Sequence, residues 1–301
     1  MPQIANETVD VFTETRFGGN PLAVISDARG LSAEAMQRIA REFNYSESTF
    51  VLPPVDASNT ARVRIFTPAS ESPVAGHPNV GTAFVLGRMG EIFGKPVGDE
   101  MRFEEGAGLV AIQLARRDGQ VVGAGIQAPR DLEIGEQVEP AIVAACVSLQ
   151  PSDIASERHA PVFASVGLEF VIAEVRSVDR LAKMQADVAA FRKAHQRHGG
   201  DAERLSLFVY SRLSPSRVRA RMFAPLTNVP EDPATGSASA ALGALLASLE
   251  KGGDAFQVTI EQGVEMGRPS LIHVRADMRD GRRRVTVTGN CVPVMRGTIA
   301  L

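Results

Sequence analysis

The chain has 301 residues, of which 44% are hydrophobic and 22% are charged, and its net charge is −3. A length well beyond the usual domain size of roughly 100–200 residues predicts a globular protein with two domains or one large core. Because acidic residues slightly outnumber basic ones, we expect no basic surface for nucleic acid. The apolar runs at residues 140–149 and 238–249 fall short of the roughly 18 residues that span a bilayer, and the first residues lack the pattern of a signal peptide, so no membrane association is expected.

The first half of the chain alternates short apolar runs, typical of strands, with segments of helical spacing. Ser32 precedes the first helical segment and is a suitable N-cap. The predicted elements are a strand at residues 20–26, a helix at 31–43, strands at 48–52 and 62–66, a helix at 80–86 and further strands between 101 and 114.

The same order of elements returns after about residue 160. The predicted elements there are a strand at residues 168–175, a helix at 178–195, strands at 205–210 and 217–223, a helix at 238–249, and strands at 258–261 and 271–274. Matching residues keep a nearly constant separation, which is 157 residues for Phe66 and Phe223, 155 for Gly81 and Gly236, and 157 for Gly106 and Gly263. Two long repeats predict two similar domains related by a pseudo-two-fold axis, with the linker within residues 118–160, near 125–139.

Each repeat centres on a short motif that opens its second predicted helix. The motif is His77-Pro-Asn-Val-Gly-Thr-Ala83 in the first repeat and Asp232-Pro-Ala-Thr-Gly-Ser-Ala238 in the second. Proline suits the first helical position, aspartate before it is a common N-cap, and glycine leaves the amides at the positive helix end open to an anion. Either motif alone fits a helix cap or a surface hydrogen bond equally well. Their occurrence at equivalent positions favours one cleft with His77 and Asp232 on opposite walls.

Several segments together carry a specific resemblance. They are Gly18-Gly-Asn-Pro-Leu-Ala-Val24, Glu42-Phe-Asn-Tyr-Ser-Glu-Ser-Thr-Phe50, Phe66-Thr-Pro68 with Ala75-Gly-His-Pro78, Glu231-Asp-Pro-Ala-Thr-Gly-Ser-Ala238, Gln262-Gly with Met266-Gly-Arg-Pro-Ser270, and residues 289–301. This set resembles the PhzF family of phenazine-biosynthesis-like isomerases over essentially the whole chain. Departures from the family pattern at Ser72-Pro-Val74 and Asn79 concern the shape of the pocket and therefore the identity of the substrate.

The resemblance implies an α+β fold of the diaminopimelate epimerase type. Such a fold has two pseudo-symmetric domains, each a β-barrel-like sheet around a central helix, with the active site between them. We assign residues 1–118 to the first domain and 125–288 to the second, and expect a C-terminal strand at about 289–301 to return to the first domain. The resemblance also implies a homodimer.

The family pattern assigns roles to individual residues. It implies that Glu47 is the proton-shuttling base and that His77 and Asp232 are the other polar catalytic residues. Read without the resemblance, Glu47 is an ordinary surface glutamate. The expected substrate-binding residues are Asn20, Ser46, Gly76, Gly236 and Ser237, with the amides at residues 76–77 and 236–237 holding a carboxylate.

Other chemistries find little support in the sequence. Cys146 and Cys291 lie away from the two motifs, so both are expected in the core, and a chain with two cysteines suits a reducing, cytoplasmic compartment. His195 and His198 have a spacing that could bind a metal, but they lie at a helix end without further ligands, so a solvated turn is favoured. No dinucleotide or phosphate-loop pattern is present, and we expect neither a cofactor nor a metal.

The sequence therefore predicts a cofactor-independent isomerase that moves a proton within a small carboxylate-bearing substrate. Two alternatives remain open. One is an amino-acid or hydroxy-acid epimerase or racemase of the same fold, with Glu47 and Asp232 as bases on opposite faces of the substrate. The other is a carboxylate-binding or assembly protein without catalysis, which the presence of Glu47, His77 and Asp232 together disfavours.

Overall fold

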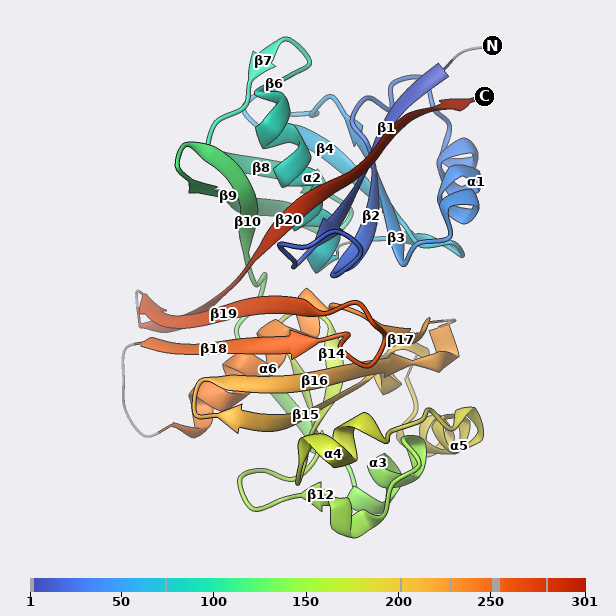
Figure 1. Ribbon diagram of the computed structural model, residues 1–301, viewed down its shortest axis with the longest axis vertical. Helices are drawn as coiled ribbons and strands as arrows, with labels where there is room; N and C mark the ends of the chain where they lie inside the picture. The colour runs from blue at the N-terminus through green and yellow to red at the C-terminus, as the bar shows by residue number, and fades with distance from the viewer. Residues whose placement is uncertain (1–2, 74, 201, 228, 251–254, 280) are drawn as a thin grey trace. The chain divides into compact units, whose positions relative to one another are not determined.

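The computed structural model describes residues 3–73, 75–200, 202–227, 229–250, 255–279 and 281–301, so Val74 of the Ser72-Pro-Val74 departure lies outside the described residues. The chain divides into two compact units, Met1–Gln127 with Thr288–Leu301, and Ala128–Val287. Strand β20 (Arg282–Ala300) begins in the second unit and ends in the first (Figure 1). Among the described residues, no helix is long and apolar enough to cross a membrane.

The first unit is built mainly of strands. Its helices are α1 (Ala33–Phe43) and α2 (Gly76–Met89). Its strands are β1 (Gln3–Val11), β2 (Asn20–Ile25), β3 (Glu47–Leu52), β4 (Ala61–Phe66), β5 (Glu71–Ser72), β6 (Glu91–Ile92), β7 (Lys95–Pro96), β8 (Glu100–Glu105), β9 (Gly108–Arg117) and β10 (Gln120–Gln127). The C-terminal part of β20 joins them.

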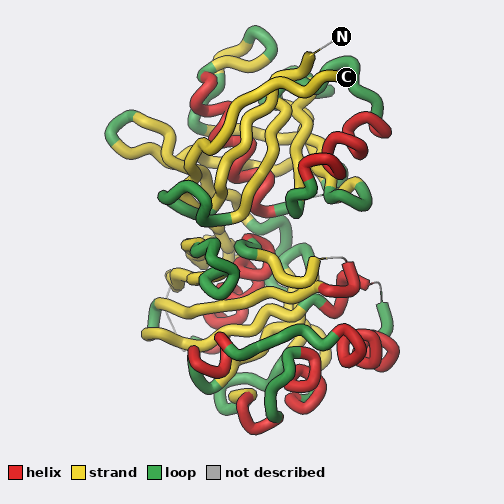
Figure 2. The backbone as a smooth tube through the Cα atoms, turned by 45° about the vertical axis from the view of Figure 1, so that its right-hand side comes forward, coloured by secondary structure: helices red, strands yellow, loops and turns green. Residues whose placement is uncertain are grey.

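These strands close into a barrel around α2. The order of the 8 strands is β1, β2, β3, β4, β8, β9, β10 and β20, which pairs in turn with β1. The two chain ends therefore lie side by side, with Gln3 opposite Ala300. Figure 2 shows the strands of this unit surrounding the helix. Every α2 residue from His77 to Leu86 is buried, including the polar His77, Asn79 and Thr82, as expected for a helix enclosed by a barrel.

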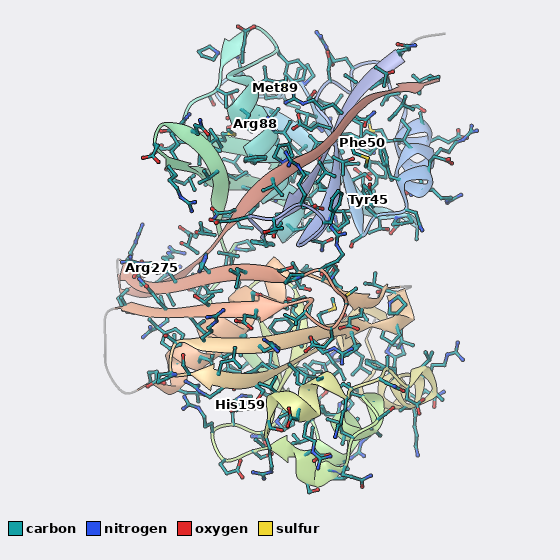
Figure 3. All side chains as sticks on the ribbon, viewed as in Figure 1. Tyr45, Phe50, Arg88, Met89, His159 and Arg275 are labelled. Atoms are coloured by element: carbon teal, nitrogen blue, oxygen red, sulfur yellow. The ribbon has the colours of Figure 1, made fainter. Side chains whose placement is uncertain are left out.

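Helix α1 covers the outside of the same barrel. Ser32 is its N-cap and accepts a hydrogen bond from the Ala35 amide at 3.1 Å, as the sequence predicts. The helix buries Met36, Ile39 and Ala40 against Phe50 of β3, which is labelled in Figure 3. Burial of this apolar face stabilises α1 on the barrel.

The second unit has more helices. They are α3 (Pro140–Cys146), α4 (Val178–Ala182), α5 (Val188–His198), α6 (Gly236–Leu249) and the short 3₁₀ turns Pro151–Asp153, Ala202–Leu205 and Pro225–Thr227. Its strands, besides the start of β20, are β11 (Glu133–Gln137), β12 (Ile154–Ala155), β13 (Val162–Ser165), β14 (Glu169–Val175), β15 (Leu207–Ser214), β16 (Arg217–Ala224), β17 (Val229–Asp232), β18 (Ala255–Gln262) and β19 (Ser270–Arg279). Helix α6 is its central helix, and every residue from Ala238 to Ala247 is buried.

Strand pairing confirms the internal duplication. In each unit a parallel pair comes first (β2 with β3, β14 with β15) and is followed by an antiparallel pair (β3 with β4, β15 with β16). A second parallel pair (β4 with β8, β16 with β18) and a second antiparallel pair (β8 with β9, β18 with β19) complete the match. In sequence, the central helix lies between the strands of the second parallel pair in both units: α2 between β4 and β8, and α6 between β16 and β18.

Two elements differ from the sequence-based prediction. The single helix predicted at residues 178–195 is wrong, because the chain forms α4 and α5 with a break between them. In the break, the amides of Gln185 and Asp187 donate to the carbonyls of Val147 and Cys146 at the end of α3, at 3.1 and 2.9 Å. The Asp187 side chain then caps α5. The region near residues 125–139, predicted as linker, also contains β11 and the end of β10.

Candidate active site

Glu47 stands at the start of β3, directly after the turn that ends α1. Asn44 ends the helix in the left-handed conformation, with φ of 53°, which asparagine tolerates better than most residues. Parallel pairing with β2 places Glu47 opposite Leu22. The Glu47 side chain is 20% exposed, so the strand fixes its backbone while its carboxylate stays partly open.

A polar cluster forms around Glu47 within the first unit. Nδ1 of His77 lies 3.6 Å from Oε2 of Glu47 and 3.4 Å from Nδ2 of Asn20. Ser46 donates from its hydroxyl to Oδ1 of Asn20 at 3.2 Å. The structure thus brings together Glu47, His77, Asn20 and Ser46, with Gly76 beside His77 at the start of α2.

The same contacts favour one tautomer of His77. Oδ1 of Asn20 accepts from Ser46 and its Nδ2 faces His77, an arrangement in which Nδ1 of His77 acts as the acceptor. Burial lowers the pKa of His77 to about 3, so the imidazole is neutral and Glu47 does not form an ion pair with it. The proton then resides on Nε2, a buried atom with no hydrogen-bond partner among the described residues.

Asp232 lies at the corresponding place in the second unit. It ends β17, and its Oδ2 accepts a hydrogen bond from the Thr235 hydroxyl at 2.5 Å. Gln262 crosses this loop, donating from Nε2 to the Asp232 carbonyl at 2.8 Å and accepting from the Thr235 amide at 3.0 Å. Gly236 and Ser237 follow as the first residues of α6. Gln262 is not among the predicted site residues, although it lies in one of the segments that resemble the PhzF family.

The motif helices begin at other residues than predicted. Helix α2 starts at Gly76 with Ala75 as N-cap, and α6 starts at Gly236 with Thr235 as N-cap, so neither Pro78 nor Pro233 opens a helix. The Asp232 side chain therefore bonds to a loop hydroxyl and is not the N-cap of α6.

The prediction that Gly81 opens the helix end to a ligand is wrong. The structure gives this glycine a packing role. It is buried in α2, and a Cβ there would lie 2.6 Å from Cδ2 of Leu22 and 2.7 Å from Cγ2 of Val11. The glycine therefore lets the central helix approach the barrel wall closely.

The two cysteines and His198 lie in packed surroundings. Cys146 and Cys291 are buried, as predicted, and burial raises the pKa of both thiols, to about 12 for Cys146. The solvated turn predicted for His198 is wrong, because its ring packs against Phe163 and its Nδ1 lies 3.1 Å from Oε1 of Glu136. Within the described residues, no group of three or more histidine, cysteine or acidic side chains could hold a metal ion.

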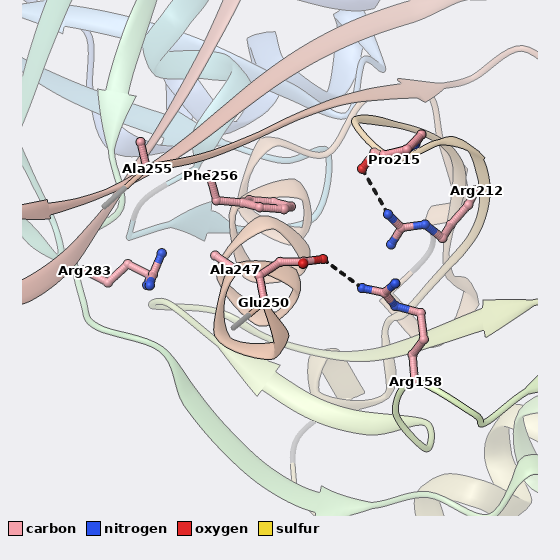
Figure 4. Close-up of a pocket in the computed structure, with 8 residues that line it drawn as sticks. All are labelled: Arg158, Arg212, Pro215, Ala247, Glu250, Ala255, Phe256 and Arg283. Atoms are coloured by element: carbon pink, nitrogen blue, oxygen red, sulfur yellow. Dashed lines mark hydrogen bonds and ion pairs between the residues drawn. The ribbon is translucent and has the colours of Figure 1, made fainter. Parts of the chain in front are cut away.

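The second unit also has a surface cavity that contains none of the predicted site residues (Figure 4). Its volume is about 640 Å³, and Arg158, Arg212, Phe256 and Arg283 are among its lining residues. Arg158 pairs with Glu250 at 3.1 Å and Arg212 donates to the Pro215 carbonyl at 2.9 Å, so two of the three arginines already have protein partners. Its carboxylate, Glu250, is the group that pairs with Arg158.

Comparisons with known proteins agree with this architecture. The family model for phenazine biosynthesis-like proteins, PhzC-PhzF, matches residues 9–297. The trans-2,3-dihydro-3-hydroxyanthranilate isomerase of Pseudomonas chlororaphis is 38% identical over 296 residues, which cover 97% of this chain and 98% of that protein. The crystal structure of a Bacillus anthracis PhzF-family protein superposes with a TM-score of 0.88 at 24% identity, covering 100% of both chains.

The similarity of fold extends to epimerases. A hydroxyproline epimerase from Agrobacterium vitis superposes with a TM-score of 0.61 at 17% identity, covering 99% of this chain and 93% of that chain. Two duplicated units with central helices are thus the epimerase-like α+β fold that the sequence predicts. Given a family match over nearly its whole length and a close relative named as an isomerase, the chain belongs to the PhzC-PhzF family of phenazine biosynthesis-like proteins and is an isomerase.

Proposed function

We propose that this isomerase shifts a proton within a small carboxylate-bearing substrate without a cofactor, and that trans-2,3-dihydro-3-hydroxyanthranilate, the substrate named for its relative from Pseudomonas chlororaphis, is the first compound to test. The observation that supports the proposal is the partly open Glu47 carboxylate beside a neutral, buried His77. A carboxylate next to an uncharged imidazole is a proton acceptor whose neighbour does not neutralise it.

The reaction needs only proton movement. Glu47 takes a proton from a carbon next to a π-system, and the electron pair of that C–H bond moves into the π-system. Protonated Glu47 then returns the proton to another carbon of the same π-system, so the product is an isomer and no redox partner is consumed.

Other residues bind the substrate in this proposal. The Nε2–H of His77 is a buried donor that a substrate oxygen can satisfy. Asn20, Ser46 and the Gly76 amide lie around the same group. In the second unit, we propose Asp232 as a further proton-handling group and the amides of Gly236 and Ser237 as carboxylate ligands. We also propose that the chain forms a homodimer and that it works in the cytoplasm, a reducing compartment that suits its two buried free cysteines.

The test is incubation of the purified chain with this substrate in D₂O, with no cofactor added, followed by NMR. Movement of a double bond with up to one deuterium in the product supports isomerisation by a proton shuttle. Inversion of one stereocentre without bond movement supports the epimerase alternative, with Glu47 and Asp232 as two bases. Saturable binding of substrate without any product would show that the chain only binds carboxylates and would refute the proposal.

A further inference from the structure

A buried arginine holds the strand that leads to Asp232. Arg221 of β16 binds Glu231, the residue directly before Asp232, through two parallel hydrogen bonds. Its Nε donates to Oε1 of Glu231 at 2.7 Å and its Nη2 donates to Oε2 at 2.8 Å. Such a bidentate pair fixes the direction of both side chains as well as their separation. We call this pair the Arg221–Glu231 clamp.

The same guanidinium also binds the break between α4 and α5. Its Nη1 donates to the carbonyls of Leu181 and Met184, at 3.0 and 2.9 Å. Four of the five N–H groups of Arg221 therefore have protein partners. Arg221 thus joins β17 to β16 and to the end of α4, which are segments distant in sequence.

Backbone pairing alone gives β17 few fixed points. The strand has four residues, and it pairs with β16 through Asp232 opposite Met222 and Val229 opposite Ala224, with a shift of register between the two pairs. Successive side chains of a strand point to opposite faces, so Glu231 can serve the clamp while Asp232 binds the Thr235 hydroxyl. The clamp supplies a fixed point directly beside Asp232 that this short, irregular ladder lacks.

The first unit contains the same arrangement. Arg64 of β4 binds Glu71 of β5 from its Nε at 2.7 Å and from its Nη2 at 2.6 Å. Arg64 and Arg221 are 157 residues apart, which is the separation of the matched residues of their strands. Glu71 and Glu231 each lie five residues before the first residue of the central helix. A bidentate pair at the same place in both units belongs to the duplicated architecture and is not a chance surface contact.

The clamp of the second unit is the more deeply buried of the two pairs. The side chains of Arg221 and Glu231 are 8% and 17% exposed, against 19% and 44% for Arg64 and Glu71. Withdrawing two charges from water is costly, and an apolar pair of similar volume can stabilise a fold as well or better. An apolar pair does not fix a direction, however, so a buried bidentate pair before Asp232 points to a role in placing that residue.

We propose that Arg221 and Glu231 are positioning residues, which hold β17 so that the Asp232 carboxyl keeps its place against Thr235. Neither side chain touches the substrate in this proposal. The role in activity rests on the proposed function, in which Asp232 handles a proton. Loss of either partner leaves a buried charge unpaired beside Asp232 and releases the loop at residues 232–235.

The clamp is tested first without substrate, by amide hydrogen exchange followed by mass spectrometry. The probe is the Thr235 amide, which donates to Oε1 of Gln262 at 3.0 Å. In E231Q, the peptide that contains Thr235 should exchange roughly tenfold faster than in the wild type, while the body of α6 stays protected. E71Q is the matched control, because it breaks the equivalent pair of the first unit and should leave exchange at Thr235 unchanged.

A second variant, R221K, tests the geometry of the pair. Lysine keeps the positive charge but has no planar fork, so it cannot make the two parallel bonds to Glu231. R221K should therefore also speed exchange at Thr235, and it provides the same test if E231Q does not fold.

Action through Asp232 is tested by a double-mutant cycle on kcat/KM. E231Q should lower kcat/KM roughly tenfold in the wild-type background, within the 10²-fold that a misplacement of about 1 Å can cost. In the D232N background, where the side chain no longer handles a proton, E231Q should cause no further loss. A merely structural role would lower kcat/KM by the same factor in both backgrounds.

The outcomes separate the two proposals. Wild-type exchange at Thr235 in E231Q and R221K, or equally faster exchange throughout α6, would overturn the inference. Faster local exchange with equal losses of kcat/KM in both backgrounds would overturn the positioning role. Faster local exchange, with no turnover even by the wild type, would support the clamp and reject the proposed function alone.

Discussion

At the scale of single residues, His77 is the group whose charge state the structure decides most clearly. It touches Glu47 at 3.6 Å, a distance at which a protonated imidazole would form an ion pair. Desolvation in the barrel interior opposes that charge and lowers the pKa of His77 to about 3. A neutral imidazole does not form an ion pair with the Glu47 carboxylate, in keeping with the proposed role of Glu47 as a base.

A neutral His77 predicts a specific acid sensitivity. In the unfolded chain a histidine takes up a proton below about pH 6.5, whereas the folded chain resists protonation down to about pH 3. Stability is therefore fully present above pH 6.5 and is lost as pH falls, by at most about 1.4 kcal/mol per pH unit. Urea unfolding between pH 6.5 and pH 4 should show a smaller loss for H77N than for the wild type.

The exposed His273 provides the matched control. H273N should lose stability on acidification as the wild type does. Equal slopes for H77N and the wild type would mean that His77 is already protonated in the folded chain, contrary to the account.

At the residue scale, the sequence indicated which side chains lie together where a motif carried the information. Glu47, His77, Asn20 and Ser46 come from three segments that the family pattern marks, and the structure brings them together. Gln262 was missed because its hydrogen bonds join segments distant in sequence. The matched glycine that follows it, Gly263, was a usable signal.

At the scale of elements, the central helix α2 depends on its close approach to the barrel wall. A Cβ at Gly81 would overlap the side chains of Leu22 and Val11. We expect G81A to destabilise the chain by about 1–3 kcal/mol, the usual cost of overpacking a core. Equilibrium unfolding in urea measures the change in the free energy of unfolding.

G98A is the control for this substitution, because the nearest atom to a Cβ there lies 3.8 Å away. Its effect on stability should stay within about 0.5 kcal/mol. If G81A were as stable as G98A, the wall would yield to the extra carbon, and the packing role assigned to Gly81 would be wrong.

Elements were predictable where local signals and burial agreed. The period of α1 and its Ser32 cap gave the correct helix, and the apolar run of residues 238–249 lies within α6. The break between α4 and α5 was not predictable, because its cause is the hydrogen bonding of its amides to the end of α3, which local spacing does not contain.

At the scale of the whole molecule, the chain carries one architecture twice and uses its last strand to complete the first copy. Closure of the first barrel needs the end of β20 between β10 and β1. The part of β20 from residue 288 onward covers the edges of β1 and β10, which would otherwise remain unpaired. The duplication was visible in sequence because the separations of matched residues hardly change.

The oligomeric state remains a prediction from the family resemblance. Sedimentation equilibrium at micromolar concentration should give twice the chain mass of 32.1 kDa. A single species of 32.1 kDa would contradict the homodimer.

The central claim is that Glu47 moves the proton, and E47Q tests it most directly. Glutamine keeps the size of the side chain and part of its hydrogen bonding but has no basic oxygen of comparable strength. The account predicts that E47Q binds trans-2,3-dihydro-3-hydroxyanthranilate with nearly wild-type affinity, while kcat falls by roughly 10²–10⁴-fold. Turnover by E47Q at the wild-type rate would contradict the account and remove Glu47 from the mechanism.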